Sequence, residues 1–166
     1  MRRPANVINE RDVEWSEKSH SGRFGFRRRQ LAAATGASKL GCSLYEIGPG
    51  RTSFPHHYHC ANEEAIFVLE GSASLRLASG EVPIGPGDYV TLPVGAGGAH
   101  QVVNRSNAPV RYLCLSTMIE PEVSVYPDSD KVGFFAGSAP GGALEKRTIE
   151  GFVPLAARVD YFYGED

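Results

Sequence analysis

Short apolar and β-branched segments, separated by glycine and proline, run through most of the chain. We predict strands near residues 24–31, 40–47, 52–58, 65–70, 72–77, 89–92, 100–104, 110–118 and 123–126. Turns are expected at 48–50, 79–81, 85–88 and 106–109. No segment keeps the i, i+3, i+4, i+7 spacing of an amphipathic helix over three turns. This succession predicts an all-β protein, a sandwich or a barrel, with little helix.

The two ends of the chain are less regular. Residues 1–22 are polar with isolated apolar anchors, and we expect an arm that packs over the barrel or over a second subunit. Residues 127–166 pass through a glycine-rich stretch and close with the aromatic segment 159–163. Because an aromatic cluster is rarely left in water, we expect this tail to return and pack on the outside of the barrel. The length of 166 residues is that of one domain, 1–166, with the barrel core at about 41–118.

Charge and cysteine content narrow the function classes. The 17 basic and 19 acidic residues give a net charge of −2, which argues against nucleic-acid or anionic-membrane binding. No apolar run is long enough to span a bilayer, and the N-terminus lacks a signal-peptide core, so we expect a cytoplasmic protein. Cys42 and Cys114 fall in apolar runs and are interpreted as buried strand residues. Cys60 is expected to face away from the neighbouring histidines.

A group of histidines and a glutamate has the spacing of ligands on strands. Residues two apart on a strand point the same way, so His57 and His59 can face one cavity while Tyr58 faces outward. Glu64 and His100 complete a set of three imidazoles and one carboxylate, which is typical of a divalent metal site. Glu63 competes with Glu64, but alternation gives Glu63 the opposite direction, and Glu64 has the better spacing to the following glycine.

These residues lie in two motifs, Gly50-x6-His57-x-His59-x4-Glu64-x6-Gly71 and Gly87-x5-Pro93-x-Gly95-x4-His100-x3-Asn104. The motifs resemble the two signature motifs of the cupin superfamily. The resemblance implies a double-stranded β-helix, or jelly-roll barrel, that is usually dimeric. It also implies His57, His59, Glu64 and His100 as metal ligands, with Asn104 closing the second motif. One added residue before His57 and two before His100 fall in loops, where insertions cost little.

The predicted ligand set is typical of a catalytic metal site and not of a purely structural one. Three histidines and one glutamate leave open positions on a five- or six-coordinate ion, and we expect one divalent transition metal, Zn, Fe, Mn, Ni or Co. Glu64 is the candidate catalytic residue, because it could move off the metal and act as a base. The expected partner is a small molecule that offers oxygens to the metal. Counting by twos from Glu64 and from His100 predicts a pocket lined by Ile66, Val68, Val102 and Asn104, and we expect Phe54 at its entrance.

Two classes of function follow. The first is a metal-dependent enzyme, either an isomerase of a sugar phosphate or an oxygenase of the dioxygenase type; the whole chain resembles single-domain bacterial cupins described as sugar-phosphate-isomerase-like or polyketide-synthesis-like. An isomerase needs a phosphate site, for which Arg76 and Arg111 are candidates. The second class is a non-catalytic metal-dependent module that binds or senses a small molecule.

Three further expectations concern the surface. The run 27–29 of three arginines is interpreted as a solvated edge strand and not as an anion patch. His56, next to His57, is expected to be partly exposed near the barrel mouth. Because a half-open barrel exposes edges, we expect a homodimer formed through an edge strand and the N-terminal arm.

Overall fold

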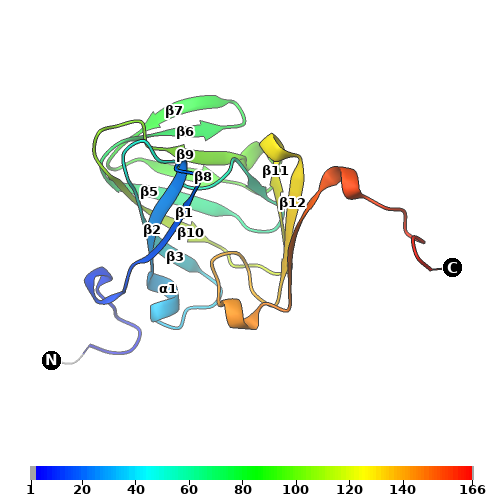
Figure 1. Ribbon diagram of the computed structural model, residues 1–166. Helices are drawn as coiled ribbons and strands as arrows, with labels where there is room; N and C mark the ends of the chain where they lie inside the picture. The colour runs from blue at the N-terminus through cyan, green and yellow to red at the C-terminus, as the bar shows by residue number, and fades with distance from the viewer. Residues whose placement is uncertain (1–2, 166) are drawn as a thin grey trace.

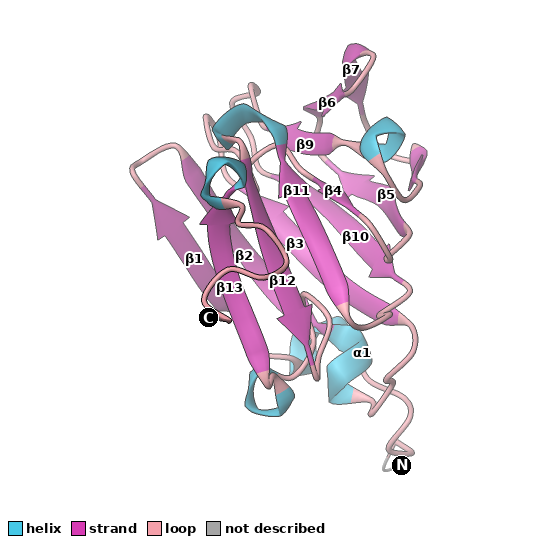
Figure 2. Cartoon of the chain, turned by 90° about the vertical axis from the view of Figure 1, so that its right-hand side faces the viewer, coloured by secondary structure: helices cyan, strands magenta, loops and turns pink. Residues whose placement is uncertain are grey.

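The computed structural model describes residues 3–165 and shows two layers of antiparallel strands that enclose a common core (Figures 1 and 2). The first layer is a six-stranded sheet. Its strands, in spatial order, are β1 (Ser16–His20), β2 (Phe24–Gln30), β3 (Gly41–Ile47), β10 (Val110–Ser116), β5 (Glu64–Glu70) and β8 (Tyr89–Leu92).

The second layer consists of two sheets that meet at one residue pair. One sheet has the order β7 (Gly80–Ile84), β6 (Ala73–Leu77), β9 (His100–Val103), and the other has the order β13 (Ile149–Pro154), β12 (Lys131–Ala136), β11 (Glu122–Tyr126), β4 (Tyr58–His59). The isolated antiparallel pair of His57 and His100 connects them through N–H···O distances of 3.2 and 2.9 Å. Two facing layers joined in this way form the expected double-stranded β-helix.

Helical structure is confined to short turns. The single α-helix, α1 (Leu31–Ala34), follows β2, and none of the helices within residues 3–165 has the length and hydropathy required to cross a bilayer. The 3-10 segments are Glu10–Asp12, Ala96–Gly98, Pro127–Ser129, Leu144–Lys146 and Leu155–Ala157.

The core follows from strand alternation. On β5, Ile66 and Val68 are buried between the layers, while Phe67 and Leu69 point outward and are partly exposed. Alternate residues of a strand face opposite sides, so each strand contributes every second residue to the interior. The buried cluster consists of Phe26, Tyr45, Ile47, Ile66, Val68, Ala73, Leu75, Ile84, Leu92, Val102, Val110 and Tyr112.

The inward positions of the six-stranded sheet become polar toward one end. On β5 the inward series runs from Val68 through Ile66 to Glu64, and in the sheet register Glu64 pairs with Ser116 of β10. The neighbouring strands change in the same direction. Their inward series are Val110, Tyr112, Cys114, Ser116 on β10, Ile47, Tyr45, Ser43 on β3, and Phe26, Arg28, Gln30 on β2.

Some predicted elements differ from the observed ones. Residues 52–58 were predicted as a strand, but only Tyr58–His59 forms one, with isolated bridges at Thr52 and His57. Pro55 lies in this segment and lacks the N–H group that a continuous ladder needs. The strands β1, β7, β12 and β13 were missed, because their polar, glycine and proline residues obscure the alternation of apolar side chains.

The two terminal segments behave differently. The N-terminal segment joins the six-stranded sheet: β1 pairs with β2 as its edge strand, and Trp15 lies against the guanidinium groups of Arg27 and Arg29. The C-terminal segment returns as β12 and β13, but its aromatic end does not pack on the barrel. Tyr161, Phe162 and Tyr163 are 90%, 72% and 72% exposed, and the end of the chain points away from the sheets (Figure 1). The expectation of a packed aromatic tail was therefore wrong, since no strand follows β13 to hold it; residues 1, 2 and 166 of the two segments lie outside the described part.

Gly71, which follows β5, has a conformation that other residues adopt only with strain. Its φ is +73°, and a Cβ atom there would clash with the Pro109 carbonyl oxygen. We expect Gly71→Ala to lower the free energy of unfolding by about 2–4 kcal/mol, because backbone strain and steric overlap add. Gly50→Ala is the matched control, since Gly50 has φ +70° but no atom within 4 Å of an added Cβ, and should cost only about 1 kcal/mol. Urea unfolding measures both, and equal losses would contradict the steric argument.

Candidate metal centre

The four predicted ligand residues meet at the polar end of the barrel. Ligand atoms of His57, His59 and Glu64 all lie within 4.8 Å of one another. His100 joins them, because its Nε2 is 3.5 Å from Glu64 Oε2, the same distance that separates this oxygen from His59 Nε2. The ring centres of His57 and His100 are 4.6 Å apart. Glu63, by contrast, is exposed on the opposite side of the strand.

Each imidazole is held by its Nδ1 atom. His57 Nδ1 lies 2.8 Å from the carbonyl oxygen of Pro55, and His100 Nδ1 lies 2.9 Å from that of Gly98. A carbonyl oxygen can only accept, so Nδ1 carries the proton and Nε2 keeps its lone pair. His59 Nδ1 lies 3.3 Å from the Ser124 hydroxyl. With His59 deprotonated, the Nε2 atoms of the three histidines and the Glu64 carboxylate form a donor set that fits a divalent transition ion.

Glu122 supports this arrangement from β11. Its carboxylate accepts hydrogen bonds from the backbone N–H groups of Cys60 at 2.9 Å, Ala61 at 3.3 Å and Asn62 at 2.8 Å, and from the Asn62 side chain. One oxygen also lies 3.7 Å from His59 Nδ1. Glu122 therefore fixes the turn that separates His59 from Glu64 and contacts the His59 ring itself.

The sequence analysis missed β11 as part of the site because the strand is polar on its buried face. Glu122 and Ser124 are 0% and 1% exposed, whereas Val123 is 39% exposed. Tyr126, on the same face, stacks on His57 with ring centres 5.7 Å apart. Polar–apolar alternation normally indicates that the polar face meets solvent. The signal that could have located this face is its composition, a carboxylate, a hydroxyl and a phenol at alternate positions.

The charges in the centre depend on one another. Burial, together with the neighbouring His100 and His59, lowers the pKa of His57 to about 3. Burial also disfavours a charged His59, but hydrogen bonds with Glu122 and Glu64 raise its pKa to about 9. Burial alone would raise the pKa of Glu64, yet hydrogen bonds with His100 and His59 hold it well below its usual range. The centre thus stabilises positive charge between two carboxylates, which is the environment that a cation requires.

The predicted pocket residues have different positions. Ile66, Val68 and Val102 are buried in the core, and Phe54 packs against Phe26 and next to His57, with ring centres 4.6 and 6.1 Å apart. Asn104 instead holds the loop after β9: its amide donates to the carbonyl oxygens of Ile47 and Ala108, both at 2.8 Å. The hydrogen bonds of Asn104 therefore support a structural role.

Several other residues that the sequence analysis singled out contact carboxylates of the protein. His56 is only 6% exposed, so the expectation of a partly exposed side chain was wrong; its Nδ1 lies 3.8 Å from Asp128. The phosphate candidates are paired with carboxylates, Arg76 with Asp128 at 2.6 and 2.8 Å, and Arg111 with Glu70 at 3.0 Å. Cys60 is exposed in the turn after β4, and Cys42 and Cys114 are partly buried.

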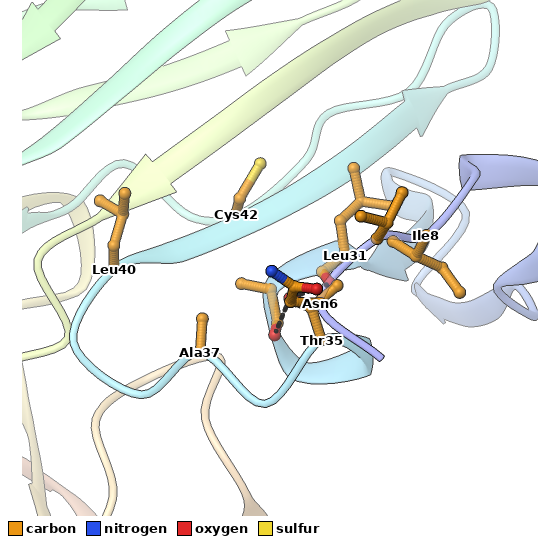
Figure 3. Close-up of a pocket in the computed structure, with 9 residues that line it drawn as sticks. Asn6, Ile8, Leu31, Thr35, Ala37, Leu40 and Cys42 are labelled. Atoms are coloured by element: carbon orange, nitrogen blue, oxygen red, sulfur yellow. Dashed lines mark hydrogen bonds between the residues drawn. The ribbon is translucent and has the colours of Figure 1, made fainter. Parts of the chain in front are cut away.

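A cavity of about 470 Å³ lies away from the metal centre, between the N-terminal arm and α1 (Figure 3). The cavity is open and mainly apolar, and no candidate metal ligand contributes to it. Its lining consists of Asn6, Val7, Ile8, Leu31, Ala32, Thr35, Ala37, Leu40 and Cys42.

The family model of the cupin domain matches residues 43–116, which include all four candidate ligands. This chain contains a cupin domain. The tetracenomycin polyketide synthase protein TcmJ of Streptomyces glaucescens is 27% identical over 131 residues, which cover 77% of this chain and 86% of TcmJ.

Two solved structures extend the likeness. A sugar phosphate isomerase from a cupin superfamily, from Silicibacter pomeroyi, has a TM-score of 0.77 and 28% identity, and the match covers 91% of this chain and 94% of that one. The polyketide cyclase RemF of Streptomyces resistomycificus has a TM-score of 0.58 and 27% identity over 70% of this chain and 78% of its own. The first match includes most of the terminal extensions as well as the barrel.

Removing one imidazole should empty the centre. We expect His59→Ala and His100→Ala each to lose stoichiometric metal, because only two nitrogens and one carboxylate remain. His56→Ala is the matched control: it changes the adjacent histidine, whose side chain contacts Asp128 and not the centre. Elemental analysis of protein purified without chelators or a histidine tag measures the metal content. Full metal retention in His59→Ala would exclude the proposed ligand set.

Glu122→Gln should weaken metal binding without removing a ligand. The amide cannot accept as many hydrogen bonds as the carboxylate, so the Cys60–Asn62 turn and the His59 ring lose their fixed orientation. We expect a decrease in metal affinity of roughly 10–100-fold. Competition with a chromophoric chelator measures it, and Glu63→Gln, an exposed position beside Glu64, should bind metal like the unchanged protein.

Proposed function

We propose that this cupin is a metal-dependent isomerase that acts on a small hydroxy-carbonyl compound of the sugar phosphate class. The observation that carries the proposal is the convergence of three Nε2 atoms and one carboxylate at the polar end of a barrel. Such a set leaves coordination positions open for a substrate. The 28% identity to a sugar phosphate isomerase, over nearly the whole of both chains, supports the reaction class.

The proposed roles follow from the positions of the side chains. His57, His59, His100 and Glu64 would hold the ion, which would supply Lewis acidity toward a substrate oxygen. Glu64 is proposed as the base that takes the proton from the hydroxyl-bearing carbon and returns it to the former carbonyl carbon, while the hydroxyl proton passes to the carbonyl oxygen. Its carboxylate is kept ionised by His100 and His59. Phe54 and Ile66 would exclude water from this end of the core.

A second enzyme class has its own support. TcmJ and RemF resemble this chain over 77% and 70% of its length, and their names place them in polyketide chemistry. Dioxygenase-type chemistry on an enolic substrate would use the same four residues with a redox-active ion. A non-catalytic module that binds or senses a small molecule is the remaining alternative, supported by the low exposure of the three histidines.

A cytoplasmic homodimer completes the proposal. Free thiols at Cys42, Cys60 and Cys114 agree with a reducing compartment. The strand β1 forms one edge of the six-stranded sheet and offers unpaired backbone groups to a second subunit. The exposed aromatic residues near the C-terminus provide further apolar surface that a partner could cover.

Solvent exchange distinguishes the three alternatives. In D₂O, metal-loaded protein should incorporate deuterium next to the carbonyl of an aldose or ketose phosphate, detected by NMR, because the proton passes through a base that exchanges with water. His100→Ala should incorporate none, and His20→Ala, an exposed histidine on β1, should behave like the unchanged protein. Oxygen consumption without deuterium uptake would support the oxygenase. Metal-dependent ligand binding with neither oxygen consumption nor deuterium uptake would support the non-catalytic binding module.

A further inference from the structure

The three consecutive arginines of β2 divide between the two faces of the six-stranded sheet. Arg27 and Arg29 point outward, where both guanidinium groups lie against Trp15, 4.6 and 4.3 Å from the ring centre. Arg28 points the other way, on the same face as Phe26, which belongs to the barrel core. The expectation of a uniformly solvated strand is therefore wrong: Arg28 faces inward, and the Arg29 side chain is only 15% exposed.

The outward arginines have carboxylate partners and Arg28 has none. Arg27 pairs with Glu46 at 3.0 Å, and Arg29 pairs with Glu10. Among residues 3–165, no carboxylate lies within salt-bridge distance of Arg28, and its buried Nε atom has no hydrogen-bond partner. The Nε of Arg29 is also unpartnered, but its Nη1 is bound to Glu10. Withdrawing a guanidinium partly from water without a counter-ion costs free energy, unless a ligand provides the negative charge.

Arg28 and Glu64 share the polar end of the interior. In the register, Arg28 lies beside Tyr45, Tyr45 beside Tyr112, and two residues further along β10 is Cys114. Tyr45 and Cys114 are close enough to both Glu64 and Arg28 to respond to their charges. Burial raises the pKa of Tyr45 and of Cys114, the negative charge of Glu64 raises both further, and the positive charge of Arg28 lowers both. Arg28 and Glu64 therefore lie on the same inward face of the six-stranded sheet, on either side of Tyr45 and Cys114.

The segment after β12 passes next to the Arg28 side chain. A Cβ atom added at Gly141 would lie 3.7 Å from Arg28 Nη1, and the Gln30 side chain donates to the Gly141 carbonyl oxygen at 2.7 Å. A narrow space of about 40 Å³ remains at the rim, lined by Gln30, Ser43, Met118, Gly141 and their neighbours. Arg28 is thus half-buried beneath this segment.

We infer that Arg28 binds an oxyanion of the substrate, a phosphate or a carboxylate group, while the metal centre binds the reacting oxygens. The inference deepens the proposed function and rests on it for the identity of the reacting end. A guanidinium presents a planar set of N–H donors that matches either oxyanion, and the Tyr45 hydroxyl lies beside it. Arg28 thereby supplies the anion site that Arg76 and Arg111, both paired with carboxylates, do not offer.

The test uses inorganic phosphate as the probe on the full-length protein, with acetate as a second arm for the carboxylate alternative. Phosphate or acetate should raise the thermal unfolding midpoint of the unchanged protein, both metal-loaded and after chelation, because the guanidinium and not the metal holds it. Arg28→Gln should weaken the binding measured by calorimetry by about tenfold or more. Arg27→Gln, the neighbouring outward arginine, should bind as the unchanged protein does.

Two further readouts separate anion binding from a structural role. Arg28→Gln should keep its metal content and should unfold at the same or a higher temperature without phosphate, since the substitution removes an unpaired charge. Arg28→Lys should fold and bind several-fold more weakly than the unchanged protein, because it keeps the charge but loses the planar donors.

The inference is overturned if neither anion stabilises the unchanged protein, or if Arg28→Gln binds them equally well. If the protein binds anions through Arg28 but shows no isomerase activity, the anion site is supported and the proposed reaction is rejected.

Discussion

The backbone pair of His57 and His100 is the interaction on which the candidate site depends. Its two hydrogen bonds, of 3.2 and 2.9 Å, are the isolated bridge between the two sheets of the second layer. Residues paired in this way project their side chains to the same face, so the bridge that joins the two sheets of the second layer also brings two imidazoles together. His59 follows two residues later and is tied to the next loop by the Gly95 N–H at 2.7 Å. The junction of these two sheets and the assembly of the candidate site therefore depend on the same backbone pair.

The barrel separates the apolar surface that stabilises the fold from the polar groups that serve the site. Burial of Val68, Leu75 and Val110 at one end provides hydrophobic free energy. At the other end, Glu64 and Glu122 are removed from water, which is costly unless each charge finds partners. Glu122 obtains them from backbone N–H groups, whereas Glu64 faces two imidazoles and would be best compensated by a cation. The asymmetry explains how one small core can hold several ionisable groups.

Much of the centre could be predicted from spacing, because alternation on strands is a local property. It distinguished Glu64 from Glu63 and placed Ile66 and Val68 in the core. The predictions that failed concern side chains whose positions depend on tertiary contacts. Asn104 fits the second motif, but only the fold reveals its bonds to the loop after β9. The sequence shows three consecutive arginines and does not tell which of them faces inward. The contacts of Arg27 and Arg29 with Trp15 identify the outer face, and Arg28 therefore lies on the inner one.

The parts of the chain outside the matched segment 43–116 shape the chemistry of the site. Glu122 and Ser124, which orient His59, come from β11, and Arg28 comes from β2. The loop over Arg28 is held by Arg147, whose guanidinium donates to the carbonyl oxygen of Ala139 at 3.0 Å. A barrel with the same four ligands but different flanking strands would keep the metal chemistry and lose these contacts. Similarity confined to the two motifs is therefore informative mainly about the metal. Similarity that extends over the flanking strands is more informative about the substrate.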